Sequence, residues 1–196
     1  MHIALIRAAA VPAALMLLLP GVSPAQDKAP QRQIADAVRP LPDSLRAGAK
    51  ILGYRGGQLV TLREGENGMI CLADDPREKG FHVSCYHRSL EPFMARGRVL
   101  RAQGATREAV ESTRFAEIEA GKLAMPAQPA ALYQLFHDDD AFDPAGGDTT
   151  GLRGLDVIYM PYATTATTGI STTPSRTGPW LMYPGKPWAH LMLNRR

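Results

Sequence analysis

The densest cluster of potential metal ligands in the sequence consists of His82, Cys85, His87 and Glu91. Side chains alternate along a strand, so Cys85 and His87 would share one face, with Glu91 nearby at the start of a helix. Zinc or copper needs three or four converging ligands, and His190 could supply one of them. A cysteine in a disulfide is not available to a metal, however, and a histidine at a strand–helix junction can bond to the backbone instead. We therefore expect neither a bound metal nor a cofactor.

A second cluster begins with His137 and continues with the carboxylates of Asp138, Asp139, Asp140, Asp143 and Asp148. Oxygen-rich loops bind calcium, but this segment lacks the alternating acidic positions, central glycine and terminal glutamate of an EF-hand. A histidine beside an aspartate can also serve as a general acid–base pair. One alternative function is therefore a periplasmic hydrolase that uses His137 or His190 with nearby aspartates. The competing interpretation is a solvated acidic loop.

A third group combines aromatic, sulfur and imidazole side chains in an expected C-terminal hairpin. Trp188, His190 and Met192 would share one strand face, which could bind copper or line a small-molecule pocket. The threonine-rich segment 163–179 beside it could then act as a lid. The other face of residues 188–193 is apolar as well, which is typical of a buried strand with His190 in the core.

Composition and motifs exclude several classes of protein. The 22 basic and 19 acidic residues leave a net charge of +3, which is too small to support binding to nucleic acids. Glycine and proline contribute 18 and 16 of 196 residues, too few for a disordered or collagenous chain. The sequence also lacks the nucleophile elbow, the phosphate loop, the dinucleotide-binding glycines, and the metalloprotease and haem-attachment motifs. Neither the composition nor the motifs identify an enzyme class.

Residues 1–25 have the organisation of a secretory signal peptide. Arg7 precedes the apolar run 8–19, Pro20 ends that run, and residues 23–25 place small side chains at a cleavage site. The run is shorter than the roughly 20 apolar residues of a membrane-spanning helix, and an uncleaved anchor is the alternative. We expect an exported protein, periplasmic or extracellular, with no membrane span after cleavage.

The two cysteines, Cys71 and Cys85, would then meet an oxidising compartment, where one disulfide is the simplest arrangement. The alternative is a thiol or metal pair, although redox pairs usually have the spacing Cys-x-x-Cys. If strands 69–72 and 81–86 pair symmetrically about Glu78, Cys71 lies opposite Cys85. That register would suit a disulfide.

The elements that must position these residues follow from turn signals and apolar runs. The expected strands are residues 50–54, 58–63, 69–72, 81–86, 155–162, 180–183 and 188–193, and residues 130–136 could be a strand or a short helix. The expected helices are residues 33–38, a turn at 43–46, residues 90–102 capped by Ser89, and a helix from Thr106 to about residue 120.

Together these elements predict an α+β fold, in which two or three helices pack on one face of a mostly antiparallel sheet. We expect residues 26–40 to form a flexible N-terminal segment. Residues 41–196 are expected to form a single domain with one disulfide.

Residues 63–68 leading to Cys71, residues 85–94, and residues 178–182 with 187–190 carry a further signal. They resemble a group of uncharacterised exported bacterial proteins with no assigned activity. The resemblance covers most of the chain after residue 25. It implies export and assigns no functional residue.

The expected function is that of a non-catalytic binding or structural protein of the cell envelope. Its partner would be a small molecule or another envelope protein, and its oligomeric state is not indicated. The hydrolase and a metal-binding protein are the alternatives. The residues expected at a ligand-binding site are His87, Glu91, His137, Trp188 and His190.

Overall fold

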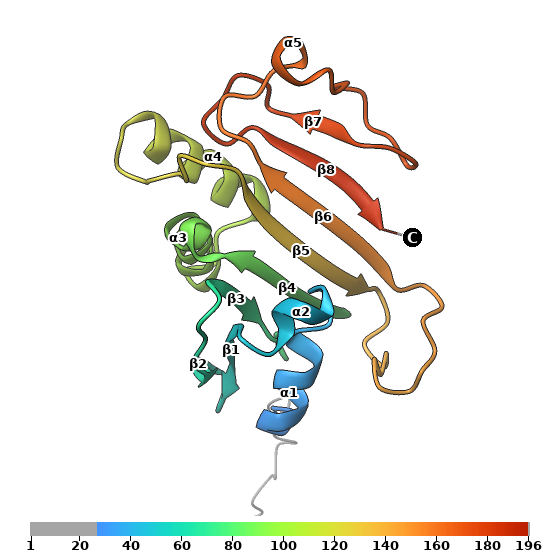
Figure 1. Cartoon of the computed structure of the whole chain (residues 1–196). Helices are drawn as coiled ribbons and strands as arrows, with labels where there is room; N and C mark the ends of the chain where they lie inside the picture. The colour runs from blue at the N-terminus through green and yellow to red at the C-terminus, as the bar shows by residue number, and fades with distance from the viewer. Residues whose placement is uncertain (1–26, 196) are drawn as a thin grey trace, which may run out of the picture.

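The computed structural model describes residues 27–195, so the expected signal peptide at 1–25 lies outside the described residues. A single sheet of eight strands forms the framework, in the order β2-β1-β3-β4-β5-β6-β8-β7 (Figure 1). Neighbouring strands are antiparallel throughout except for β1 and β3, which are parallel. The sheet is therefore mixed, with antiparallel pairing in the majority, as the sequence predicts.

The strands are β1 (Lys50–Arg55), β2 (Gln58–Arg63), β3 (Met69–Leu72), β4 (Phe81–His87), β5 (Ala130–His137), β6 (Arg153–Tyr159), β7 (Trp180–Met182) and β8 (His190–Arg195). The helices are α1 (Pro30–Ala37), α2 (Asp43–Arg46), α3 (Glu91–Ala102), α4 (Arg107–Glu119) and α5 (Thr165–Thr168), with a 3-10 helix at Arg88–Leu90. The ambiguous segment 130–136 is thus a strand, and Thr106 caps α4 as expected, because its side chain accepts from the Ala109 N–H. None of the helices within residues 27–195 combines the length and apolar character that a membrane span requires.

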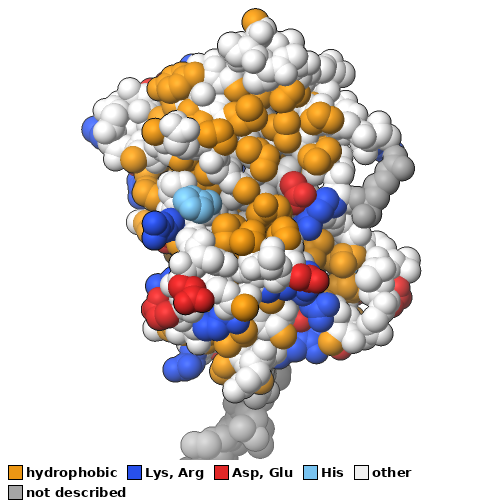
Figure 2. Space-filling view, viewed as in Figure 1, with side chains coloured by type: hydrophobic (Ala, Val, Ile, Leu, Met, Phe, Trp, Pro, Cys, Tyr) orange, Lys and Arg blue, Asp and Glu red, His pale blue; other side chains and the backbone are white. Residues whose placement is uncertain are grey.

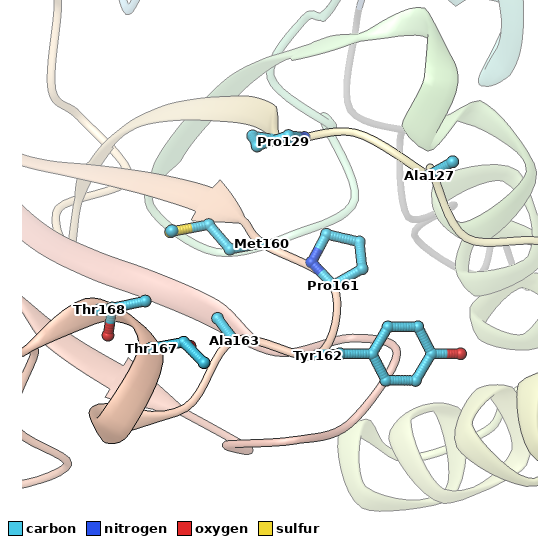
Figure 3. Close-up of a pocket in the computed structure, with 8 residues that line it drawn as sticks. All are labelled: Ala127, Pro129, Met160, Pro161, Tyr162, Ala163, Thr167 and Thr168. Carbon is cyan, nitrogen blue, oxygen red and sulfur yellow. The ribbon is translucent and has the colours of Figure 1, made fainter.

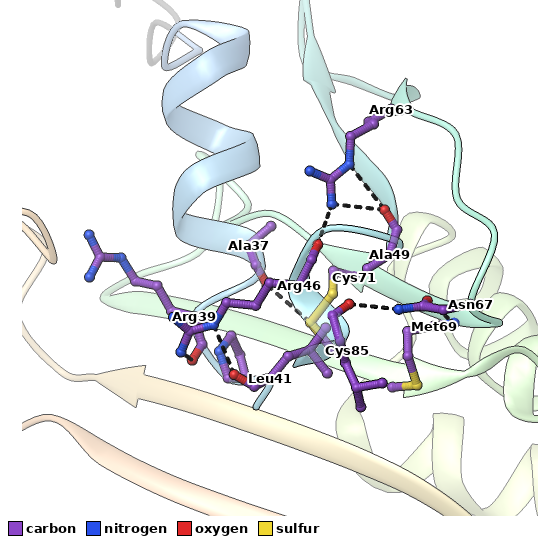
Figure 4. Close-up of a disulfide and its surroundings, with 12 residues drawn as sticks. Ala37, Arg39, Leu41, Arg46, Ala49, Arg63, Asn67, Met69, Cys71 and Cys85 are labelled. Atoms are coloured by element: carbon purple, nitrogen blue, oxygen red, sulfur yellow. Dashed lines mark hydrogen bonds between the residues drawn. A yellow bond between two sulfur atoms is a disulfide. The ribbon is translucent and has the colours of Figure 1, made fainter. Parts of the chain in front are cut away.

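The expected disulfide is confirmed, together with the strand register that positions it. Cys71 of β3 pairs directly with Cys85 of β4, and both side chains are fully buried (Figure 4). The Cys85 sulfur lies 3.1 Å from the Ala37 carbonyl oxygen at the end of α1. The disulfide therefore sits at the centre of a core that β3 and β4 share with α1.

The helices lie on both faces of the sheet, which corrects the expectation of two or three helices on one face. On one face, α3 and α4 cover a cluster that includes Tyr86, Leu132 and Val157. On the other, α1 and the chain leading to α2 cover Cys71 and Cys85. Alternate side chains of one strand point to opposite faces, so these apolar strands need two separate covers.

Helix α1 occupies much of the segment expected to be flexible. Gln33 is buried and hydrogen-bonds both main-chain groups of Tyr54, at 2.7 and 2.9 Å. A Cβ atom at Gly53 would approach the Gln33 Oε1 to 2.5 Å, so glycine is needed beside it. Asp36, also buried, accepts from Arg32 and Arg39 at 2.6 and 3.1 Å. The polar residues Gln33 and Asp36 of α1 are therefore buried groups whose hydrogen bonds are satisfied.

The C-terminal strand β8 is inserted between β6 and β7. The edge strand β7 has only three residues, and the Leu181 N–H donates to the Ser171 carbonyl at 2.8 Å. The threonine-rich segment 163–179 therefore runs along the edge of the sheet and covers part of it. Short, covered edges resist pairing with other chains.

Candidate functional site

His87 caps a helix and does not meet Glu91. Its Nδ1 atom accepts from the Ser89 N–H at 3.4 Å and lies 2.9 Å from the Ser89 hydroxyl, so His87 caps the 3-10 helix Arg88–Leu90. Helix α3 follows directly, with Leu90 at its N-cap and no side-chain cap, so the cap expected from Ser89 is not formed. Glu91 instead accepts from Arg98 at 2.6 Å and from the Tyr86 hydroxyl. The structure thus separates the two side chains, because His87 and Tyr86 point to opposite faces of β4.

The proposed metal ligands do not converge. Within residues 27–195, no three His, Cys, Asp or Glu side chains come together closely enough to hold an ion. Cys85 is consumed by the disulfide, and His82 and His190 lie on the sheet face opposite His87. The potential metal ligands that lie close together in the sequence therefore do not lie close together in the structure.

His137 fastens the acidic loop to the sheet with both ring nitrogens. Its Nδ1 accepts from the Asp139 N–H at 3.0 Å, and its Nε2 lies 3.0 Å from the Thr150 carbonyl, to which it donates. The ring also stacks on Phe142, with centroids 4.3 Å apart. A histidine held in this way has no free nitrogen to act as a general base, so the pairing with aspartate expected for a hydrolase is not formed.

Trp188 is a core residue rather than a pocket residue. It is 3% exposed and stacks on Phe115 of α4, with centroids 4.0 Å apart and an interplanar angle of 8°. His190 donates through Nδ1 to the Trp188 carbonyl at 2.8 Å, and burial lowers its pKa, which favours the neutral ring. These side chains join α4 to the sheet.

Tyr159, beside His190, makes the stability of this core sensitive to alkaline pH. Burial raises the pKa of Tyr159 to about 12. Because the pKa in the folded state exceeds the unfolded value of about 10, its contribution is present below pH 10 and is lost as pH rises toward 12. Between about pH 10 and 12 the free energy of unfolding of the natural protein should fall. We expect this fall to be smaller in Tyr159→Phe, by about 2–3 kcal/mol.

Urea unfolding monitored by circular dichroism at neutral and alkaline pH measures this effect. The control is Tyr162→Phe, because the Tyr162 side chain is 65% exposed. Burial also raises the pKa of Tyr86, so some alkaline sensitivity remains in Tyr159→Phe. Identical pH dependence of Tyr159→Phe and the natural protein would contradict the assignment.

A pocket of about 340 Å³ lies where β6 ends, in the size range of small-molecule sites (Figure 3). Its lining comes from three parts of the chain: the loop before β5, the residues that follow β6, and α5. The lining residues are Ala127, Pro129, Met160, Pro161, Tyr162, Ala163, Thr167 and Thr168. The segment 163–179 therefore contributes a wall of a pocket, and its movement as a lid stays a prediction.

The pocket lining is uncharged and largely apolar. The Thr167 and Thr168 hydroxyls both donate to the Thr164 carbonyl, at 3.1 and 2.7 Å, so their protons are already used. Tyr162 stands at the rim with a backbone φ of 62°, and its N–H donates to the Lys186 carbonyl at 2.9 Å. Positive φ is uncommon for a bulky residue and is retained only where neighbouring structure holds it. These features favour an uncharged ligand.

An apolar strip extends from the pocket across the open part of the sheet. We define it as Ala131, Ile158, Leu191 and Leu193, which point to the same face as α1 but belong to none of the core clusters described. Ala131, Ile158 and Leu191 are direct neighbours on β5, β6 and β8. Figure 2, which views the molecule from this side, shows hydrophobic side chains gathered over the upper part of the sheet.

An ion pair ends the strip. Asp156 of β6 lies 2.9 Å from the Nε of Arg195 on β8. The remaining nitrogens of Arg195 donate to the Pro40 and Gln134 carbonyls at 2.8 and 3.1 Å, so the guanidinium crosses β6. Gly154 permits this crossing, because a Cβ there would approach the Arg195 Cβ to 2.8 Å.

The strip corrects the expectation that residues 188–193 form a strand buried on both faces. Apolar residues on both faces of 188–193 predict a strand buried on both sides. One face of β8 does pack against the core through Met192, but the other face leaves Leu193 37% exposed. Of the strip, Leu193 is exposed and Ala131, Ile158 and Leu191 are half-buried, so this apolar face is partly open. Contiguous apolar patches open to solvent are a feature of binding surfaces.

Comparisons of the sequence with models of protein families, with curated proteins and with solved structures found no match.

Proposed function

We propose that the protein is an exported, non-catalytic binding protein of the cell envelope, and that it holds an uncharged, largely apolar small molecule in the pocket beside α5. The observation that carries this proposal is the lining, which joins apolar side chains to threonines whose hydroxyl protons are already used. Export is supported by the signal-peptide pattern of residues 1–25 and by the disulfide, which is typical of oxidising compartments.

The histidines considered as catalytic bases favour binding over catalysis. Both nitrogens of His137 bond to backbone groups. The Nδ1 of His190 donates to a backbone carbonyl instead of a carboxylate, and its ring is packed between Tyr159 and Tyr183. A pocket without charged or titratable groups other than a tyrosine suits a binding role.

Filling the pocket tests the proposal. Ala127 is an exposed lining residue, so Ala127→Phe should occupy the mouth of the pocket without disturbing the core. We expect p-cresol and indole to bind the natural protein with chemical-shift changes at Met160 and Ala163, and to bind Ala127→Phe about tenfold more weakly. Titration followed by two-dimensional NMR measures both the affinity and the location.

Ala124→Phe provides the matched control, because Ala124 is exposed in the same loop but does not line the pocket. It should bind both probes like the natural protein. Equal weakening by the two variants, or shift changes confined to other parts of residues 27–195, would count against the pocket.

A further inference from the structure

We propose that the natural ligand carries a single linear acyl chain, which lies along the apolar strip with its end in the pocket and its headgroup beside Asp156 and Arg195. This inference rests on the proposed function and specifies the class of ligand.

The pocket and the strip share one line of side chains on β6. Met160 lines the pocket, and Ile158 and Asp156 follow at alternate positions on the same face of the strand. At about 3.4 Å per residue, the path from Met160 to Asp156 is about 14 Å long. An extended decyl chain is comparable in length, whereas a compact ring would occupy the pocket alone.

The path is apolar at the pocket and charged at Asp156 and Arg195, so it matches a ligand with an apolar chain and a polar headgroup. The pocket end has no charged side chain, and the strip consists of Ala131, Ile158, Leu191 and Leu193, which offer no side-chain hydrogen bond. Burying an alkyl chain against such residues is favourable in proportion to the apolar surface that it removes from water. The polar headgroup of the ligand would then lie beyond the apolar residues, beside the ion pair.

The ion pair selects the headgroup. Asp156 and Arg195 carry opposite charges 2.9 Å apart, and the guanidinium is fixed by two backbone carbonyls. A free carboxylate would be attracted to Arg195 and repelled by Asp156, whereas a zwitterion presents complementary charges to both. A zwitterionic acyl lipid fits this end better than a free fatty acid.

Titration with three monomeric probes separates the contribution of the chain from that of the headgroup. We expect decylphosphocholine to bind at least about tenfold more tightly than decanoate, and phosphocholine without a chain to show no binding. Isothermal calorimetry gives the affinities, and two-dimensional NMR should show changes at Ile158 and Leu191 for decylphosphocholine but not for p-cresol.

Leu191→Ser tests the strip separately from the pocket. It should weaken decylphosphocholine about tenfold and leave p-cresol unchanged, and the matched control is Val99→Ser on the exposed face of α3. Leu193→Ser is a second strip variant, since its side chain is already 37% exposed. A circular-dichroism spectrum like that of the natural protein establishes that each variant is folded.

The outcomes separate the two proposals. Binding of p-cresol without decylphosphocholine, or decylphosphocholine binding that neither strip variant weakens, would overturn the acyl-chain inference and leave the pocket in place. Tighter binding of decanoate than of decylphosphocholine would overturn the zwitterionic headgroup. Failure of every probe to bind would contradict the proposed function itself.

Discussion

Replacing both cysteines with alanine, as Cys71→Ala/Cys85→Ala, is expected to lower the free energy of unfolding by about 3–4 kcal/mol. The disulfide joins residues 14 apart in sequence, and closing a loop of this size removes about 3 kcal/mol of chain entropy from the unfolded state. Both sulfurs are also fully buried in the cluster under α1, so their removal leaves a small cavity.

Chemical unfolding of the oxidised natural protein and of the double variant measures this loss. The natural protein treated with a reductant is the matched comparison, and it should approach the stability of the double variant. The double variant itself should not respond to reductant, because the chain has no other cysteine. A loss below about 1 kcal/mol would show that the loop is already ordered in the unfolded state.

Trp188→Ala is expected to cost about 3–5 kcal/mol, the range typical of large aromatic truncations in cores. The indole is 3% exposed, stacks on Phe115, and contacts Tyr183 edge to face. Its loss therefore opens a cavity between α4 and the sheet. We expect α4 to lose protection from hydrogen exchange before the strands do.

Trp180→Ala is the control, since Trp180 is only half-buried on the short edge strand β7. It should cost about 1 kcal/mol or less. The same pair of variants tests the interpretation of Trp188 as a ligand residue. If Trp188→Ala kept its stability and lost binding of p-cresol or indole, the structural role argued here would be wrong.

Local signals were sufficient to predict most strands and the register of the disulfide. The Asn-Gly turn at 67–68 precedes β3, and the charged turn around Glu78 separates β3 from β4. The symmetry of the second turn places Cys71 opposite Cys85. Such features depend on residues close in sequence, so no knowledge of the rest of the chain is needed.

Features that depend on distant partners could not be predicted in this way. Gln33 and Asp36 give α1 a polar sequence, and their burial is tolerated only because Tyr54 and two arginines satisfy them. The parallel pairing of β1 with β3 likewise requires knowing which strand edges remain free. An amphipathic pattern predicts that a helix has a buried face, but it does not predict which face of the sheet the helix will cover.

The candidate site was missed for the same reason. Its lining combines Ala127 and Pro129 with Met160 and with Thr167 and Thr168, and none of these residue types is chemically distinctive. The residues singled out for their chemistry make contacts that stabilise the fold: His87 caps a 3-10 helix, and both ring nitrogens of His137 hydrogen-bond the acidic loop. A binding surface made of common apolar residues has no recognisable motif, so it is hard to predict from a sequence.

The insertion of β8 between β6 and β7 sets the order in which the sheet can be completed. Residues 180–182 of β7 have no neighbouring strand until β8, which lies at the end of the described chain, takes its place beside β6. Until then β6 is an open edge, able to pair with another chain. A chain truncated before residue 190 should therefore associate with other chains through β6, which size-exclusion chromatography measures.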